Sequence, residues 1–327
     1  MNRLLATLCC LVLALFMLSL SIGTEPIPLW QSLIDWLAGN ESVQAVIVAE
    51  IRLPRALIAC LAGATLGLCG AAMQGLLRNP LASPGLVGSS SGAALFAVLF
   101  LYFYSGTAGT LLLPLVGMGG ALGATVLVYA LAGRHASITT LILAGVAINA
   151  LATALMSLLL NLAPSPYAVR ELVLWTLGDL SDRSMQDFWL MLPPTLLGWG
   201  MLIGIGYQLS ALTLGEQTAG TLGINTQRLR WRVFIAVALA VGASVATTGM
   251  IGFIGLAVPH LLRPLVAHDP AKLLPASALG GAVMLLAADI CVRLIPTQTP
   301  LKVGVVTALV GAPFFLHLVL RSRKEYV

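Results

Sequence analysis

Long apolar stretches separated by short polar segments run through the sequence from end to end. Eight of them are long enough to cross the hydrocarbon core of a bilayer as helices, which takes about 20 residues. Two further apolar pieces are too short for a complete span. The ten elements cover residues 4–22, 55–76, 89–104, 111–132, 138–160, 189–209, 231–251, 253–267, 273–292 and 303–320. The pattern predicts an all-α integral membrane protein with about ten transmembrane helices, including short or broken ones.

The two short pieces occupy matching places. The piece at 89–104 follows a full span through RNPLASPGLVG (78–88), and the piece at 253–267 follows another through GMIGFIG (249–255). Each is the third member of a run of five. Because five is odd, two such halves would have inverted orientations. Short segments interrupted by Gly or Pro at matching places of two halves are typical of transporters.

Composition agrees with a membrane protein: 59% of the 327 residues are hydrophobic, 9% are charged, and mean hydropathy is +0.98. Soluble domains carry roughly 25% charged residues. Residues 1–22 hold one arginine before a long apolar run, as a cleaved signal peptide would, but the run fits an uncleaved first span better. The net charge of +5 does not indicate nucleic-acid binding, because the cations fall mostly in short loops between the apolar stretches.

The positions of the cations indicate the topology. If the N-terminus is cytoplasmic, eleven Lys and Arg residues lie inside and six outside, which favours both termini in the cytoplasm. Six outer cations are more than such loops usually carry and need a separate reason. They are Arg52, Arg55, Arg170, Arg183, Arg293 and Lys302.

Motifs of soluble and membrane enzymes are few. The sequence has no GxxxxGK[ST] phosphate loop and no HExxH, its five cysteines form no CxxC pair, and its four histidines are widely separated. We therefore expect no metal site and no disulfide framework. Asp289 is the only acidic residue deep in a late span, and Arg293 follows at the spacing of a helical ion pair. A proton relay would need several intramembrane carboxylates or histidines.

Two polar loops carry further expectations. Residues 208–230, predicted to be cytoplasmic, favour a short amphipathic helix that ends at a glycine, serving either as a plain linker or as a contact for a partner. Residues 161–188, predicted to be external, could carry a surface helix at about 167–177. That helix would suit either protein docking or the membrane edge, with Trp175 in the aromatic belt.

Four stretches together resemble one family. They are RLPRALIACLAGATLGLCGAAMQGLLRNPLASPGLVG (52–88), GFIGLAVPHLLR (252–263), LLAADICVRL (285–294) and LKVGVVTALVGAPFFLHLVL (301–320). The chain resembles, over essentially its full length, the permease subunit of type II ATP-binding-cassette (ABC) importers for ferric siderophores, haem and cobalamin. The resemblance implies a single transmembrane permease domain over residues 1–327, in two inverted five-helix halves.

The resemblance also implies partners. They are a second permease copy, with a homodimer expected, two cytosolic ATPases and a periplasmic binding protein, in the bacterial inner membrane. ATP and magnesium would be used by the ATPase, so this subunit is no enzyme and binds no cofactor. Outward arginines of the family meet acidic residues of the binding protein, and the matching positions are Arg52, Arg55 and Arg293. Anchoring of helix ends is the alternative role for these three residues.

Further roles follow residue by residue. The cytoplasmic gate of the family matches Asn79 and Leu81 and, more loosely, Thr139 and Thr140, for which helix capping by Asn79 and Thr139 is an equal alternative. The ATPase-coupling element matches residues 215–224, and its expected contacts are Glu216, Thr218, Ala219, Leu222 and Gly223. ATP-driven closure of the ATPase would push this element.

The stretch GFIGLAVPHLLR is expected to be a signature half-span. Gly252 and Gly255 would permit a tight re-entry into the membrane, and Pro259 would fix a bend or a helix start. His260 and Arg263 would then lie near the cytoplasmic face. A haem or metal site at His260 is disfavoured, because a single histidine without partners is a poor ligand set.

These expectations define a function. The chain is expected to carry an iron chelate, a ferric siderophore or haem, from the binding protein to the cytoplasm, with cobalamin as the alternative. A secondary transporter that works without ATP is a remote alternative. A membrane enzyme acting on lipid or isoprenoid would need a carboxylate or metal cluster that the sequence does not offer.

Overall fold

A computed structural model describes residues 1–23, 27–40, 42–103, 109–133, 138–163, 169–170, 173, 176–295 and 301–324. Regular structure in these ranges is helical throughout. The helices are α1 (Asn2–Ser21), α2 (Leu29–Leu37), α3 (Val43–Val46), the π-helical η1 (Ile47–Arg52), α4 (Leu53–Leu76), the 3-10 helix η2 (Pro84–Val87), α5 (Ser89–Phe103), α6 (Gly109–Ala132), α7 (Ile138–Asn161), α9 (Met185–Leu202), α10 (Gly206–Leu212), α11 (Glu216–Thr221), α12 (Thr226–Thr248), α13 (Ile254–Leu262), the 3-10 helix η3 (Pro264–Val266), α14 (Pro270–Leu294) and α15 (Val303–Lys324).

The helices confirm a multi-span membrane protein. Six described helices are long and apolar enough to cross a bilayer, and the bent pair α9 and α10 makes a seventh. Two shorter apolar helices, α5 and Val303–Pro313 of α15, and the nine-residue α13 complete the ten expected elements. The surface helix expected at about 167–177 falls largely outside the described residues.

One expected span, 189–209, is not continuous. The helix α9 begins earlier, at a capping box in which Ser184 and Asp187 satisfy each other's backbone N–H groups. It ends at Leu202, where Ile203 turns to extended backbone and Gly204 adopts a φ of +78°. The chain then bends by 53° into α10. Glycine permits this left-handed conformation at no steric cost, so the apolar run breaks there.

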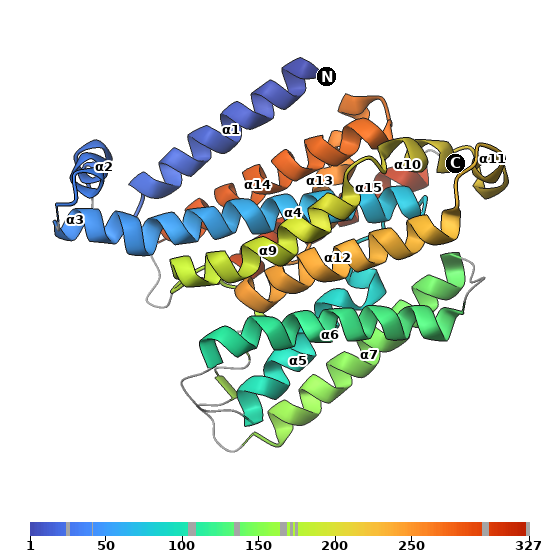
Figure 1. The fold of residues 1–327 in the computed structure, drawn as a ribbon, viewed down its shortest axis with the longest axis horizontal. Helices are drawn as coiled ribbons and strands as arrows, with labels where there is room; N and C mark the ends of the chain where they lie inside the picture. Colours follow the sequence, from blue (N-terminus) through green and yellow to red (C-terminus); the bar gives the residue numbers. More distant parts are fainter. Residues whose placement is uncertain are drawn as a thin grey trace.

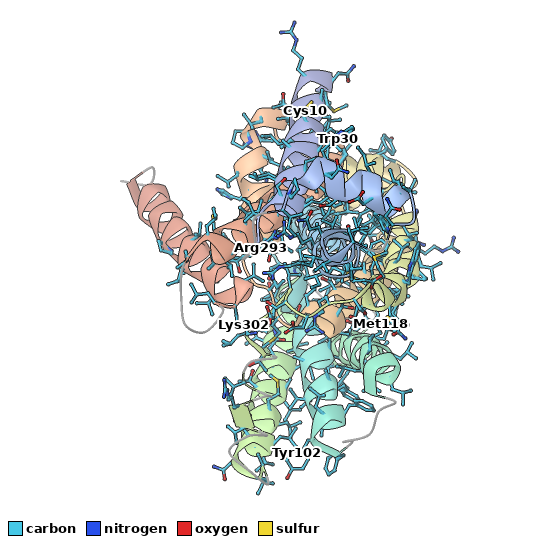
Figure 2. All side chains as sticks on the ribbon, turned by 90° about the vertical axis from the view of Figure 1, so that its left-hand side faces the viewer. Cys10, Trp30, Tyr102, Met118, Arg293 and Lys302 are labelled. Atoms are coloured by element: carbon cyan, nitrogen blue, oxygen red, sulfur yellow. The ribbon has the colours of Figure 1, made fainter. Side chains whose placement is uncertain are left out.

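The spans lie side by side, and both termini lie at the same end of the bundle (Figure 1). We call this end, which also carries α10 and α11, the terminal end, and the opposite end the distal end. Seen from the distal end, α1 with Cys10 and α5 with Tyr102 lie on opposite sides of the bundle (Figure 2). The common position of the termini agrees with an even number of crossings.

Small residues bring the central helices α4 and α14 into close contact. A methyl group built on Gly67 would lie 1.9 Å from the carbonyl oxygen of Ser277, and one built on Gly281 would lie 2.0 Å from that of Gly63. The residues form a GxxxG pattern on α4 and an SxxxG pattern on α14. Because these glycines have no side chains, the two backbones come into direct contact. Helices in a membrane associate through such close packing, since lipid is as apolar as the side chains and burying them gives no hydrophobic gain.

A second close pair, α6 with α12, is related to the first by the inversion of the halves. A methyl group on Gly242 would lie 2.6 Å from Cβ of Ala121, and one on Gly117 would lie 2.6 Å from Cβ of Ala246. The pair α4 and α14 joins the second element of the first half to the fourth of the second half. The pair α12 and α6 joins the second element of the second half to the fourth element of the first half. The same pairing thus occurs with the two halves exchanged, as expected for a bundle of two inverted five-helix halves.

Candidate functional site

The half-span α13 enters the bundle by a turn that differs from the one expected. The left-handed residues are Gly249, with φ +71°, and Phe253, with φ +66°, whereas Gly252 has no such φ, and a methyl group added to it would meet open space. Gly255 serves close packing instead, because its Cβ would lie 2.8 Å from the carbonyl oxygen of Leu66. The re-entry expected at Gly252 and Gly255 is therefore made by their neighbours.

Pro259 lies inside α13 and does not start it, contrary to one of the two roles expected for it. Proline has no N–H, so the carbonyl of Gly255 loses its usual helical donor. That carbonyl faces Gly70 of α4, where a Cβ would come within 1.9 Å of it. The weakened turn of α13 is thus supported by the backbone of α4 at its glycine.

The segment that leads into α5 is the counterpart of this turn in the first half. Asn149 of α7 holds it by donating to the carbonyl of Gly85 at 2.8 Å and by pairing with the hydroxyl of Ser91. Gly88 takes the left-handed conformation, with φ +76°. Pro84 lies against Gly255, about 3.0 Å from where its Cβ would be. The two broken segments of the two halves therefore meet inside the bundle.

The predicted gate residues lie at or near the terminal end. The side chain of Asn79 accepts from the backbone N–H of Leu81 at 2.9 Å, which closes a local turn, and Leu81 is 47% exposed. Thr139 and Thr140 are exposed in the first turn of α7. Neither Asn79 nor Thr139 caps a helix here: Ser83 precedes η2, and Thr139 lies within α7. Their role as a gate stays a prediction.

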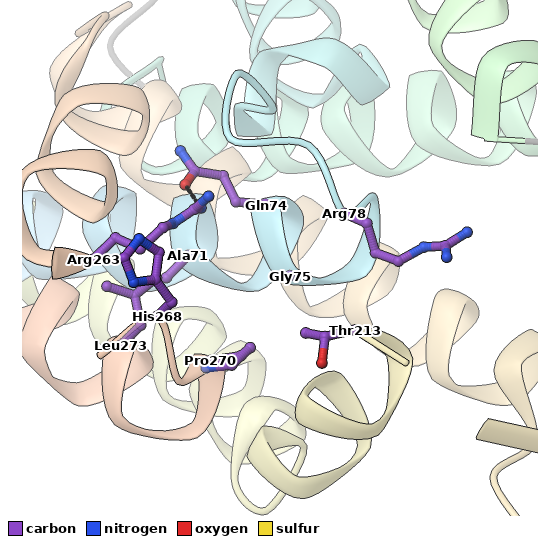
Figure 3. Close-up of a pocket in the computed structure, with 9 residues that line it drawn as sticks. All are labelled: Ala71, Gln74, Gly75, Arg78, Thr213, Arg263, His268, Pro270 and Leu273. Atoms are coloured by element: carbon purple, nitrogen blue, oxygen red, sulfur yellow. Dashed lines mark hydrogen bonds between the residues drawn. The ribbon is translucent and has the colours of Figure 1, made fainter. Parts of the chain in front are cut away.

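Beside these residues, a cavity of about 250 Å³ opens at the terminal end (Figure 3). Arg263 binds the side-chain oxygen of Gln74, whose amide nitrogen donates to the carbonyl of Leu256 at 3.2 Å. A buried glutamine thus ties α4 to both ends of the half-span α13. The described lining residues include three basic side chains and none that is acidic: Ala71, Gln74, Gly75, Arg78, Thr213, Arg263, His268, Pro270 and Leu273.

The short helix expected in the loop 208–230 is present as α11, and it ends as expected at a glycine, Gly223, with φ +80°. The carboxylate of Glu216 accepts from Arg230 at 2.6 Å and lies 3.9 Å from the guanidinium of Arg78. Ala219 is fully buried within the chain, so the exposed members of the expected contact set are Thr218, Leu222 and Gly223. Glu216 connects α11 to the residue that precedes Asn79.

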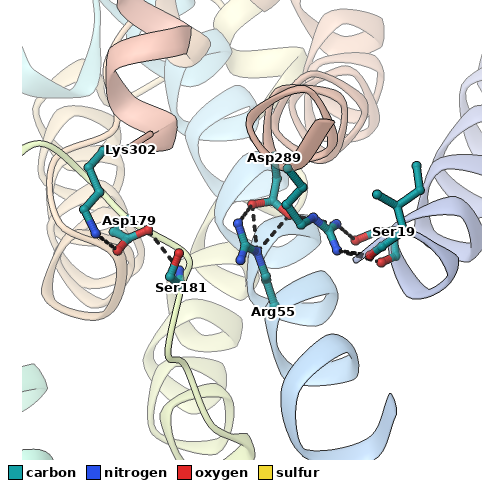
Figure 4. A network of polar contacts seen from close by, with 8 residues as sticks. Ser19, Arg55, Asp179, Ser181, Asp289 and Lys302 are labelled. Carbon is teal, nitrogen blue, oxygen red and sulfur yellow. Dashed lines mark hydrogen bonds and ion pairs between the residues drawn. The ribbon is translucent and has the colours of Figure 1, made fainter. Parts of the chain in front are cut away.

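At the distal end, Asp289 is completely buried between two arginines (Figure 4). Arg55 of α4 donates to it through Nε and Nη2, at 2.9 and 2.7 Å from Oδ1. Arg293 pairs with Oδ2 at 2.9 Å, which confirms the ion pair expected from the helical spacing. The pairing with Arg55, 234 residues away in sequence, was not expected.

The same arginine cluster holds the end of α1. Arg293 donates through Nη1 to the carbonyls of Ser19 and Ile22 at 2.8 and 2.9 Å. Arg52 donates to the carbonyls of Leu20 and Ser21 at 2.9 and 2.7 Å. Two guanidinium groups thus satisfy four carbonyls that the end of a helix leaves without donors, and their positive charge complements the helix dipole.

The three predicted docking arginines therefore form one cluster, and their guanidinium groups already have partners within the chain. Arg52 is only 5% exposed, and the side chains of Arg55 and Arg293 are mostly buried. One carboxylate balances three cations, so the cluster keeps an excess of positive charge at the distal end. The contacts within the chain anchor the end of α1, and the role of the cluster in docking stays a prediction.

A second ion pair at the distal end, Asp179 with Lys302, fixes the start of α15. Asp179 also accepts from the backbone N–H of Ser181 at 3.0 Å, and its own N–H donates to the carbonyl of Thr248 at 2.7 Å. Burial alone would raise the pKa of Asp179, but the bonds from Lys302 and Ser181 outweigh it and keep that pKa below its ordinary value. The ionised pair ties α15 to the end of α12.

Two other kinds of site lack support in the described part of the chain. No three His, Cys, Asp or Glu side chains come together there as a metal-binding group. Residues 88–92 read GSSSG, the spacing of a serine nucleophile with Ser90 at its centre. Such a nucleophile sits on a sharp turn between a strand and a helix, whereas Ser90 lies in the first turn of α5 after a 3-10 helix. The flanking Ser89 donates to the carbonyl of Pro84, and Ser91 pairs with Asn149.

Known proteins are similar to this chain over nearly its whole length. The profile of the FecCD transport family matches residues 11–321. Vitamin B12 import system permease proteins BtuC of Salmonella paratyphi A and Salmonella typhi are 39% and 40% identical over 324 residues, covering 98% of this chain and 96% of theirs. A solved inward-facing ABC transporter described as of metal-chelate type aligns with a TM-score of 0.85 and 31% identity, over 98% of this chain and 99% of that one.

Proposed function

The chain belongs to the FecCD transport family, so it is a membrane permease of a bacterial ABC importer, and from this premise we propose what it carries, how it is oriented and how it is driven. The observation that carries the proposal is the match over nearly the full length, which includes both broken segments. Such importers work with an ATPase and a binding protein, so the chain is the part that forms the pathway.

We propose a cobalt–corrin of the cobalamin class as the substrate, with an iron chelate as the second candidate. The relatives named for vitamin B12 import, at 39% and 40% identity, favour the first. The transporter of metal-chelate type favours the wider class. This order reverses the one expected from the sequence, which put the iron chelate first. Both substrates are large metal chelates and make the same demand for a wide pathway.

For the assembly, we propose a homodimer of this chain in the bacterial inner membrane, with two ATPases at the terminal end and a binding protein at the distal end. The excess of Lys and Arg in loops of the terminal end supports a cytoplasmic position for that end and both termini. The positive excess around Arg52, Arg55 and Arg293 supports an acidic partner surface at the distal end. The chain itself would bind no cofactor, and magnesium and ATP would be held by the ATPase.

The helix α11 would couple ATP hydrolysis by the ATPase to movement of the permease. Glu216 at its start pairs with Arg230 of α12 and faces Arg78, which directly precedes the predicted gate residue Asn79. Both Arg78 and Glu216 are substantially exposed, and an exposed pair contributes at most about 1 kcal/mol. Such a contact breaks and re-forms easily, which suits an element that has to move in each cycle. ATP-driven closure would shift α11 and, through Arg78, the loop after α4.

The transport function has a direct test. The chain is reconstituted in liposomes with its partner ATPase and binding protein, and uptake of labelled cyanocobalamin, a ferric siderophore and haem is measured. We expect uptake of cyanocobalamin that requires ATP and is lost with a hydrolysis-deficient ATPase. Uptake of the siderophore or haem alone would select the second candidate. Uptake without ATP that an ionophore abolishes would overturn the importer and favour a secondary transporter.

The coupling element has its own test, Gly223→Pro. Gly223 has φ +80° and donates its N–H to the carbonyl of Gly220 at 3.0 Å. Proline fixes φ near −65° and has no N–H, so the end of α11 would have to rearrange. We expect ATP-driven uptake to fall about tenfold or more while the assembled ATPase still hydrolyses ATP.

The matched control for this variant is Gly200→Ala, outside the coupling element. Gly200 lies within α9 with open space where a methyl group would go, and its φ is not left-handed. We expect uptake close to that of the unchanged chain. Normal uptake by the Gly223→Pro variant would move the coupling site away from α11.

A further inference from the structure

The helix α2 lies in the connection between α1 and α4 and was not expected from the sequence. Its sequence, LWQSLIDWL, is strongly amphipathic. At 100° per residue the apolar side chains fall on one arc of roughly 160°, and the three polar ones fall on the other side. The polar residues are Gln31, Ser32 and Asp35.

Polar side chains of α2 make contacts within the chain, whereas three large apolar side chains on its other side are exposed. Asp35 accepts from Ser42 at 3.3 Å, and Ser32 is buried and donates to the carbonyl of Pro28. Trp30, Ile34 and Leu37, at the i, i+4 and i+7 positions of one face, are 75%, 42% and 80% exposed. Three large apolar side chains in a row do not stay in water without a reason.

The place of α2 indicates what covers this stripe. Figure 1 shows α2 nearly end-on at the distal end, while the spans lie across the page, so α2 runs across the bundle axis. Seen from the distal end, Trp30 lies at the edge of the bundle beside α1 and not over its centre (Figure 2). The helix α1 itself exposes apolar side chains, among them Leu13 and Met17. The stripe of α2 thus lies next to a helix that also exposes large apolar side chains.

We propose that α2 is an interfacial helix that lies in the plane of the membrane, with Trp30, Ile34 and Leu37 in the headgroup region of the distal leaflet. An amphipathic helix parallel to the membrane buries its apolar face at the boundary between headgroups and acyl chains. Tryptophan is enriched at this depth, because its ring is largely apolar and its N–H is polar. The stripe carries no charge, which favours lipid over the acidic partner proposed for the arginine cluster.

The anchor would fix the depth of the distal end. The helix α2 packs against α3 and η1, and η1 ends at Arg52, which holds the end of α1. A helix held at the membrane surface would thus keep this segment, and with it the arginine cluster, at a constant depth. The inference depends on the placement of α2 and not on the transported substrate.

Spin labels test the proposal. Single cysteines replace Trp30, Ile34 and Leu37, and separately Gln31 on the polar side, in a chain whose five native cysteines are removed, and each variant is placed in lipid nanodiscs. Collision with oxygen, which concentrates in lipid, is compared with collision with a water-soluble nickel chelate. We expect oxygen to dominate at the three stripe positions and the nickel chelate to dominate at Gln31.

Nickel accessibility at the stripe equal to that at Gln31 would overturn the proposal. Stripe labels that are open to nickel in the nanodisc and become protected only when a binding protein is added would also overturn it, in favour of protein docking. Replacing the buried Cys69 could disturb the fold, so a second measurement is made on a chain that keeps all five native cysteines. Lipids brominated near the headgroup should quench a larger fraction of the tryptophan emission in the unchanged chain than in the Trp30→Phe variant, and equal fractions would contradict the anchor.

Discussion

Replacing Asp289 with alanine is expected to produce the largest loss of stability of any single change at the distal end. The carboxylate is fully buried, and both Arg55 and Arg293 depend on it. Removing one partner of a buried ion pair leaves uncompensated charge and costs about 3–5 kcal/mol. Here two guanidinium groups would be left without their carboxylate. We expect a lower melting temperature in detergent, and faster hydrogen exchange at the end of α1, since Arg293 would be freed.

The control is Asp182→Asn. Asp182 is exposed at the same end and has a left-handed backbone, with φ +56°, that asparagine also tolerates. Such a surface change should stay within about 0.5 kcal/mol of the unchanged chain. If Asp289→Ala melts like Asp182→Asn, the arginine cluster contributes nothing to the fold, and its arginines are free for another role.

Gly67→Val is expected to disrupt the contact between α4 and α14. A methyl group at this position would come within 1.9 Å of the carbonyl oxygen of Ser277, and this obstacle is backbone that no rotamer change can move. Overpacking a close contact typically costs about 1–3 kcal/mol, and a rigid obstacle belongs at the upper end of that range or beyond it. We expect a low yield of monodisperse protein and a lower melting temperature.

A matched control exists on α6. Gly119 is also in the middle of an apolar helix, but it has open space where its Cβ would lie. Gly119→Val should therefore give protein of ordinary yield, apart from a helix-propensity effect well below 1 kcal/mol. An equal loss in both variants would show that the contact of α4 with α14 is not the cause of the loss.

Features set by local sequence were predictable. The spans follow from hydropathy, the pair of Asp289 and Arg293 from helical spacing, and the end of α11 from Gly223, which takes the left-handed conformation. The GxxxG pattern at Gly63 and Gly67 is also a sequence signal, and it would have identified α4 as a central helix.

Other features depend on contacts that a linear pattern does not contain. The break after Leu202 lies inside a continuous apolar run, so hydropathy extends the span across it, and only Gly204 hints at a turn. The partners Arg55 and Asp289 are far apart in sequence, as are Gln74 and Arg263. Counting outer cations assumes that they face water, whereas Arg52 is buried because the end of a neighbouring helix offers it carbonyl oxygens.

The attachment of α1 sets an order for biosynthesis. Its carbonyls at residues 20 and 21 find their donor in Arg52, some 30 residues later, but Ser19 and Ile22 depend on Arg293, more than 270 residues later. The helix α1 is therefore completed as a structural element only when α14 has been made. Until α14 is present, α1 can insert into the bilayer, but two carbonyls at its end lack their donor. In a chain that stops before α14, we therefore expect α1 to be inserted in the membrane but not packed against the bundle.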